Sequence, residues 1–241
     1  MTDIDLTESS RERGGSQPLH AYLAKPAGAG PWPGVVVIHE AFGLTDVQLR
    51  QVDRVASAGF LSLAVDLFSQ GGARRCLVST MRASMSGEGR AYTDIETARL
   101  YLSEAPDCTG KIGVLGFCMG GGFALLLANS GDYAAVAPNY GRLPKELDAA
   151  MTGACPVVGS YGGRDAGLKG AAAKLDAALT GAGVVHDVKE YPTAGHSFLN
   201  DAPTGPRVLR PLMRVANVGP DPEAAEDAWR RIDSFFHEHL S

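Results

Sequence analysis

The sequence predicts an α/β fold, with a mostly parallel central sheet and helices on both of its faces. Strand-like apolar runs alternate with helix-like runs along the 241 residues, which is the pattern of repeated strand–helix–strand units. Residues 35–38 are Val-Val-Val-Ile, and a continuous β-branched run is typical of a central strand buried on both faces. A chain of this length can bury a substantial core, so we expect one domain over residues 1–241.

The first half of the chain is expected to supply three strands and two helices before the central turn. An edge strand is expected at 20–25, and buried strands are expected at 35–38 and 61–65. Helices are expected at 46–58 and 94–102. Residues 1–18 are polar and acidic, and we expect a partly flexible segment there. Residues 69–90 are rich in Gly, Ser and Arg with weak periodicity, which predicts a loop-rich excursion near the mouth of a site.

The second half continues the alternation. Helices are expected at 123–128, 170–179 and 222–239. Strands are expected at 134–137, 157–161 and 184–191. Residues 203–220 are interrupted by prolines and are expected to be irregular.

Composition excludes several classes of protein. The net charge of −5 argues against nucleic acid or an anionic membrane as the partner. The four cysteines have no metal-ligand spacing and are too few for a disulfide scaffold. We therefore expect no metal, no cofactor and a reduced compartment, the cytoplasm. No apolar leader and no run long enough to span a membrane is visible.

The most informative stretch is residues 111–122, Lys-Ile-Gly-Val-Leu-Gly-Phe-Cys-Met-Gly-Gly-Gly. A strand followed by one projecting residue and a helix is the nucleophile elbow, here with Cys118 in place of the usual serine. Gly116 and Gly120 leave room for so tight a turn, which strains the backbone of the nucleophile. A thiol at a helix N-terminus is favoured as a thiolate. The alternative is a Gly-rich turn in which Cys118 is only a small buried residue.

A nucleophilic thiol needs a base, and the base needs an acid that orients it. Asp165 follows the strand expected at 157–161, and His196 follows the strand expected at 184–191. Both would lie at the carboxyl edge of the sheet, where active groups of open α/β folds gather. An isolated Asp in such a turn is usually a helix cap. The three residues together, in the order nucleophile, acid and histidine, favour a catalytic site.

With these residues in place, the chain resembles the dienelactone hydrolase family, a branch of the α/β-hydrolase fold. The resemblance runs from about residue 19 to about residue 240. The resemblance lies in Val-Ile-His-Glu-Ala-Phe-Gly-Leu, Gly-Phe-Cys-Met-Gly-Gly, Gly-Gly-Arg-Asp and Ala-Gly-His-Ser-Phe, at residues 37–44, 116–121, 162–165 and 194–198. The second motif is the specific one, because most relatives with this fold use serine. The resemblance implies a triad of Cys118, Asp165 and His196.

The resemblance also implies a glutamate that contacts the resting thiol, and Glu40 matches it. A carboxylate near a thiol discourages ionisation of that thiol; the alternative for Glu40 is a helix-capping or surface acid. The oxyanion hole is expected from backbone N–H groups, which correspond to Met119 and Ala41.

The sequence departs from the family pattern at one place that concerns substrate binding. Members of the family hold a substrate carboxylate with arginines, one of them a few residues after the catalytic histidine. Residues 196–201 contain no arginine and add an acid, Asp201. Positive charge is available elsewhere, with no arginine assignable, from Arg74, Arg75, Arg82, Arg90, Arg207 and Arg210. The chemistry of the family is therefore better supported than its dienelactone substrate.

The sequence thus predicts a cofactor-free hydrolase that cleaves a small carboxylic ester or lactone through an acyl-enzyme on Cys118. A thioesterase or a general carboxylesterase on the same triad is an alternative. Two further alternatives are a non-catalytic ligand-binding relative and a redox thiol at Cys118. The oligomeric state stays open.

Overall fold

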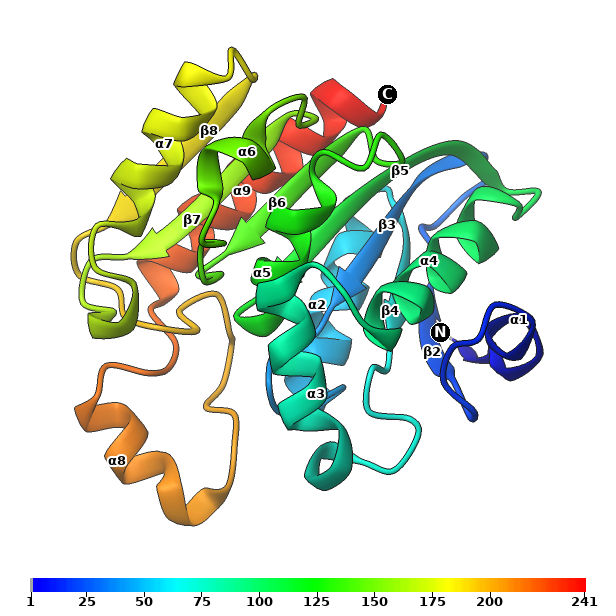
Figure 1. Ribbon diagram of the computed structural model, residues 1–241, viewed down its shortest axis with the longest axis horizontal. Helices are drawn as coiled ribbons and strands as arrows, with labels where there is room; N and C mark the ends of the chain where they lie inside the picture. The colour runs from blue at the N-terminus through cyan, green and yellow to red at the C-terminus, as the bar shows by residue number, and fades with distance from the viewer. Residues whose placement is uncertain (1) are drawn as a thin grey trace.

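An eight-stranded sheet forms the centre of the molecule (Figure 1). The computed structural model describes residues 2–241. The strands are β1 (Thr2–Asp5), β2 (His20–Ala24), β3 (Trp32–Ile38), β4 (Leu61–Val65), β5 (Cys108–Phe117), β6 (Ala135–Asn139), β7 (Val157–Gly162) and β8 (His186–Tyr191). Their order is β1-β2-β4-β3-β5-β6-β7-β8. Strand β2 pairs antiparallel with β1 and β4, and the remaining pairs are parallel. The predicted mostly parallel sheet is confirmed.

Helices cover both faces of this sheet. They are α1 (Thr7–Glu12), α2 (Asp46–Ser57), α3 (Ala73–Ser86), α4 (Arg90–Ser103), α5 (Met119–Leu127), α6 (Leu147–Met151), α7 (Ala171–Gly181), α8 (Arg210–Val215) and α9 (Pro222–Leu240), with short 3₁₀ turns at Ala166–Leu168 and Arg207–Leu209. Within β3, Val35 and Val37 face α2 and α9, whereas Val36 and Ile38 face the layer that contains α3, α4, α5 and α7. This alternation buries both faces, as the β-branched run predicts.

The register of the parallel strands brings four chain segments to one edge. Ile38 pairs with Gly116, and Phe117 pairs with Asn139. Gly162 pairs with Tyr191 on the far side of the sheet. The loops after β3, β5, β7 and β8 therefore leave the sheet at the same carboxyl edge, where the predicted site residues follow.

Four expectations about the elements need correction. Strand β2 is not an edge strand, because β1 pairs with its outer side. Segment 1–18 contains β1 and α1, and segment 203–220 contains α8; none of these was predicted. Segment 69–90 is mostly helix α3 rather than loop. The buried face of α3 is small and partly polar (Cys76, Thr80, Ala83 and Ser84), which explains its weak hydrophobic period.

None of the helices in residues 2–241 combines the length and the apolar character that crossing a bilayer requires.

Helix α5 begins at Met119, four residues earlier than the sequence predicts, because its glycines allow a very close approach to β3. A Cβ atom on Gly120 would lie 2.1 Å from the Ile38 carbonyl oxygen, and one on Gly116 would lie 2.0 Å from that of Gly120. Backbone atoms at these distances cannot yield without moving the helix.

Gly120→Ala should therefore lower the free energy of unfolding by about 1–3 kcal/mol or more, through overpacking. Urea unfolding followed by circular dichroism measures this. Gly181→Ala is the matched control, since it also lies in a helix but a Cβ there meets nothing within 4 Å. It should be neutral or stabilising by up to about 1 kcal/mol. Equal stability of Gly120→Ala and wild type would contradict the packing argument.

Candidate active site

Cys118 lies in the sharp turn between β5 and α5, as predicted. Its φ is 54° and its ψ is −110°, a conformation with positive φ that residues other than glycine rarely adopt. The Cys118 N–H donates to the carbonyl oxygen of Asn139 over 3.0 Å, and its carbonyl accepts from the Gly122 N–H over 3.2 Å. These bonds hold the half-buried thiol in a strained and fixed turn.

Asp165 and His196 meet at the same edge of the sheet. Asp165 is buried, and its Oδ2 lies 2.5 Å from His196 Nδ1. Its other oxygen accepts from the Gly167 N–H over 3.0 Å, so Asp165 also caps a short helix. Burial lowers the pKa of His196, but hydrogen bonds to Asp165 and to the Cys118 side chain outweigh it and raise the pKa to about 10. Asp165 and His196, 31 residues apart in the sequence, thus form one hydrogen-bonded pair, and Cys118 is close enough to influence the pKa of His196.

The backbone of His196 is held from both sides by residues 217–219. The His196 N–H donates to the Asn217 carbonyl over 2.8 Å, and the Gly219 N–H donates to the His196 carbonyl over 2.9 Å. A Cβ on the preceding Gly195 would lie 1.7 Å from the Asn217 carbonyl oxygen. The segment of residues 203–220, called the α8 excursion below, leads into α9. Its last residues return to the His196 loop and fix the position of the imidazole.

Glu40 is fully buried in the loop after β3, which excludes the surface-acid alternative. Its Oε2 accepts from Ser197 Oγ over 3.2 Å and from Asn200 Nδ2 over 3.3 Å. Asn200 Oδ1 in turn accepts from Gln51 Nε2 over 2.8 Å, and Gln51 Oε1 accepts from Gln48 Nε2 over 2.6 Å. No ion pair within residues 2–241 includes Glu40. Neutral donors therefore hold its carboxyl group.

The loop that carries Glu40 is anchored by the buried His39. Its Nδ1 lies 2.7 Å from the Glu40 carbonyl oxygen, and its Nε2 accepts from the Leu67 N–H over 3.1 Å. Burial lowers the pKa of His39, so the ring is a neutral donor at Nδ1 and an acceptor at Nε2. His39 thus fixes the backbone next to Ala41.

Ala41 and Met119, the predicted oxyanion-hole residues, belong to neighbouring segments. The Ala41 N–H has no hydrogen-bond partner among the described residues. Met119 is the first residue of α5, a position whose N–H has no partner within the helix. The start of α5 lies against the end of β3, as the contact between Gly120 and Ile38 requires. The Ala41 N–H and the first N–H of α5 therefore lie on neighbouring segments and are available as donors.

The charges near the site differ from the sequence-based expectation. Asp201 is exposed and forms a bidentate pair with Arg50, at 2.5 and 2.7 Å. Arg50 therefore neutralises the added acid that the sequence shows in residues 196–201. Among residues 2–241, no group of three or more His, Cys, Asp or Glu side chains is placed to hold a metal ion.

Comparison with known proteins identifies the family. The model of the dienelactone hydrolase family matches residues 19–240. The chain belongs to the dienelactone hydrolase family. It is accordingly a carboxylic ester hydrolase, and its sheet and helices form the α/β-hydrolase fold that the motifs imply.

The alignments of this dienelactone hydrolase family member with its relatives cover most of its length. A protein of Methylorubrum extorquens named "Putative carboxymethylenebutenolidase" is 31% identical over 239 residues, which cover 92% of this chain and 77% of the relative. A protein of Yersinia pestis with the same name is 30% identical and covers 92% and 84%, respectively. A solved dienelactone hydrolase-like promiscuous phosphotriesterase from metagenomic libraries is 25% identical, with a TM-score of 0.81, and covers 100% and 98%.

Sequence reasoning missed three residues that lie beside the candidate site, Tyr140, Ser197 and Asn200. The Tyr140 hydroxyl is buried without a hydrogen-bond partner in the described chain. Burial first, and then the charges of Glu40 and Cys118, raise its pKa well above the usual value. The Tyr140 ring lies 5.1 Å from that of His196. Tyr140 directly follows β6, so the strand-end rule that located Asp165 also locates this residue.

Proposed function

We propose that the protein cleaves a small carboxylic ester or lactone through an acyl-enzyme on Cys118. The observation that carries the proposal is the hydrogen bond between the buried Asp165 and His196, together with a thiol in a strained turn that helps to raise the pKa of His196. This arrangement has the roles of a nucleophile, a base and an orienting acid.

In the proposed reaction, Cys118 Sγ bonds to the acyl carbon while its proton passes to His196 Nε2. The backbone N–H groups of Met119 and Ala41 stabilise the negative oxygen of the tetrahedral intermediate. The carbon–oxygen bond then breaks, and His196 gives its proton to the leaving alkoxide. Water, deprotonated by His196, attacks the thioester, and the acid product leaves with the thiol restored.

Glu40 is proposed to restrain the thiol before substrate binds. Ser197, the residue after His196, donates to Glu40 Oε2 over 3.2 Å, which supports a place for Glu40 near the catalytic residues. A carboxylate in a buried site opposes a second negative charge nearby, whereas the raised pKa of His196 favours transfer of the thiol proton to its imidazole, and the resulting imidazolium stabilises the thiolate. The two groups act on the thiol in opposite directions.

The proposed substrate is neutral near the reacting carbonyl. The arginine that follows the catalytic histidine in the family pattern is absent here, and Asn200 in this stretch is engaged with Glu40. An arginine–carboxylate contact is charge-assisted and bidentate, and its absence weakens an anionic substrate by about 1.5–3 kcal/mol. The names of the relatives, which refer to a butenolide, support a lactone as the substrate class. We propose that the lactone bound here carries no free carboxylate.

The test compares neutral lactones and aryl esters with matched substrates that carry a free carboxylate. Neutral members should be hydrolysed, with kcat/KM roughly ten- to a hundred-fold higher than for their anionic counterparts. Steady-state kinetics at low and high salt measures this. A tenfold preference for the anionic substrates that salt erodes would show that another arginine binds them. Hydrolysis of no ester, lactone or thioester in the panel would overturn the proposed function.

A further inference from the structure

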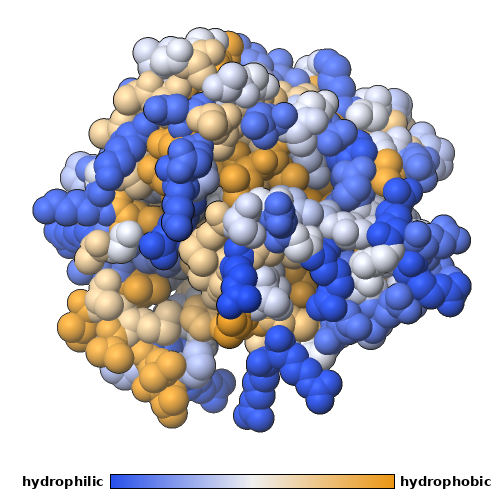
Figure 2. Space-filling view, viewed as in Figure 1, coloured by the Kyte–Doolittle hydropathy of each residue, from blue (hydrophilic) through white to orange (hydrophobic). Residues whose placement is uncertain are grey.

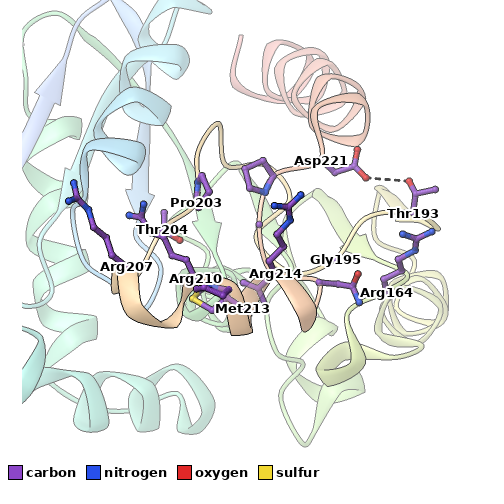
Figure 3. A pocket seen from close by; sticks show the side chains of 15 residues that line it. Arg164, Thr193, Gly195, Pro203, Thr204, Arg207, Arg210, Met213, Arg214 and Asp221 are labelled. Carbon is purple, nitrogen blue, oxygen red and sulfur yellow. Dashed lines mark hydrogen bonds between the residues drawn. The ribbon is translucent and has the colours of Figure 1, made fainter.

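A pocket with a volume of about 920 Å³ adjoins the loop that carries His196. It is bounded by the α8 excursion and by the loops after β7 and β8 (Figure 3). Its wall includes Gly195 and residues 217–219, the backbone that holds His196. Cys118, Ala41 and Met119 do not line it. Its size suits a small organic ligand, and it is distinct from the surroundings of the thiol.

Positive charge is concentrated in this pocket. Four arginines line it, one from the loop after β7 and three from the α8 excursion: Arg164, Arg207, Arg210 and Arg214. None of the four forms an ion pair with another residue of the described chain. The pocket therefore opposes the overall charge of the protein, which is −5.

A single carboxylate among the described lining residues, Asp221, does not balance these arginines. Its oxygens already accept from Thr193 Oγ1 over 3.3 Å and from the Ala224 N–H over 3.2 Å, so Asp221 caps α9. Uncompensated like charges around one cavity repel one another, and a bound anion relieves that repulsion.

The side chains of helix α8 are distributed differently from those of an ordinary surface helix. Its Arg210 and Arg214 line the pocket. By contrast, Val208, Leu212 and Val215 of the α8 excursion are 86%, 68% and 81% exposed, and Figure 2 shows the apolar surface that they contribute at the lower left. A short helix driven only by burial places its apolar residues inward. The solvent-exposed arginines that line the pocket thus point to a polar, anionic occupant.

We infer that this pocket binds a small, multiply charged anion that carries phosphate or several carboxylates. Guanidinium groups bind both kinds of oxyanion in a bidentate manner, and several of them around one cavity favour a ligand with several charges. Arg164 and Arg214 come from different elements, the loop after β7 and helix α8, so an anion that contacts both links these two segments.

Isothermal titration calorimetry at low ionic strength, with pyrophosphate and citrate as probes, tests this inference. Saturable binding with one site is expected, and the tighter of the two probes distinguishes phosphate from carboxylate recognition. Arg164→Gln and Arg214→Gln should each weaken binding by about tenfold. Binding should also weaken as salt is added, because screening acts on exposed charges.

Two control variants make the result specific. Arg13→Gln removes the same charge from an exposed arginine at the end of α1, outside the pocket, and should leave the affinity unchanged. Cys118→Ala should also bind normally, so this test is independent of the proposed ester chemistry. Absence of saturable binding by either probe would overturn the inference. So would equal losses in Arg13→Gln and Arg164→Gln, or loss of binding in Cys118→Ala.

Discussion

Cys118→Ala should abolish turnover of an activated aryl ester, by several orders of magnitude in kcat, while the protein stays folded. The alanine removes the atom that forms the acyl-enzyme, and no second thiol lies at a strand-to-helix turn of the sheet edge. Alanine and cysteine meet the same backbone constraint at positive φ, so the fold should tolerate the change. Steady-state kinetics and circular dichroism measure the two effects.

Intact-protein mass spectrometry after rapid quench should detect one acyl group on the wild-type chain, in the peptide that contains Cys118. Cys108→Ala is the control, because it removes another partly exposed thiol far from the predicted site. That variant should keep full turnover and the same adduct. Full activity of Cys118→Ala, or an adduct on another residue, would rule out Cys118 as the nucleophile.

Asp165→Asn and His196→Ala should each lower kcat by orders of magnitude, and the double variant should lose little more than either one. Residues that act as one unit show this strong non-additivity. Asparagine at 165 can still accept from the Gly167 N–H, so the helix cap survives while the charge is lost. Since Asp165 contributes to the raised pKa of His196, about 10, its replacement should lower that pKa in an NMR titration.

The chain supplies a matched control in a second Asp–His pair. Asp176 lies 3.3 Å from His186 in an exposed position, away from the carboxyl edge. Asp176→Asn should leave both turnover and the His196 titration unchanged. Independent, multiplicative losses in the Asp165 and His196 double variant would show that these two residues do not share a mechanism.

The parts of the site that lie at strand ends were predictable from the sequence, because strand and turn signals are local. Cys118, Asp165 and His196 each follow a strand that was expected within a few residues of its observed end. Parallel strands carry their carboxyl ends to one edge, so local signals were enough to place these residues together.

The parts that depend on pairing between distant segments were not predictable. The bonds from Gln51 to Asn200 and from Arg50 to Asp201 join positions about 150 residues apart, and no local pattern encodes them. Strand β1 was missed for a related reason, since its four residues are mostly polar and exposed and become a strand only by pairing with β2. Helix α3 was missed because small and polar side chains form its buried face.

The two outermost strands also determine how this sheet meets other copies of itself. Strand β1 is four residues long and carries Asp3 and Asp5, and β8 carries Asp187, Lys189 and Glu190. Charged outer strands, and the short length of β1, discourage the addition of another chain through backbone hydrogen bonds, which is the usual route to edge-to-edge aggregation. The long, apolar strands β3 and β5 lie in the middle, where both neighbours are already paired. The sheet is therefore closed to growth at both ends.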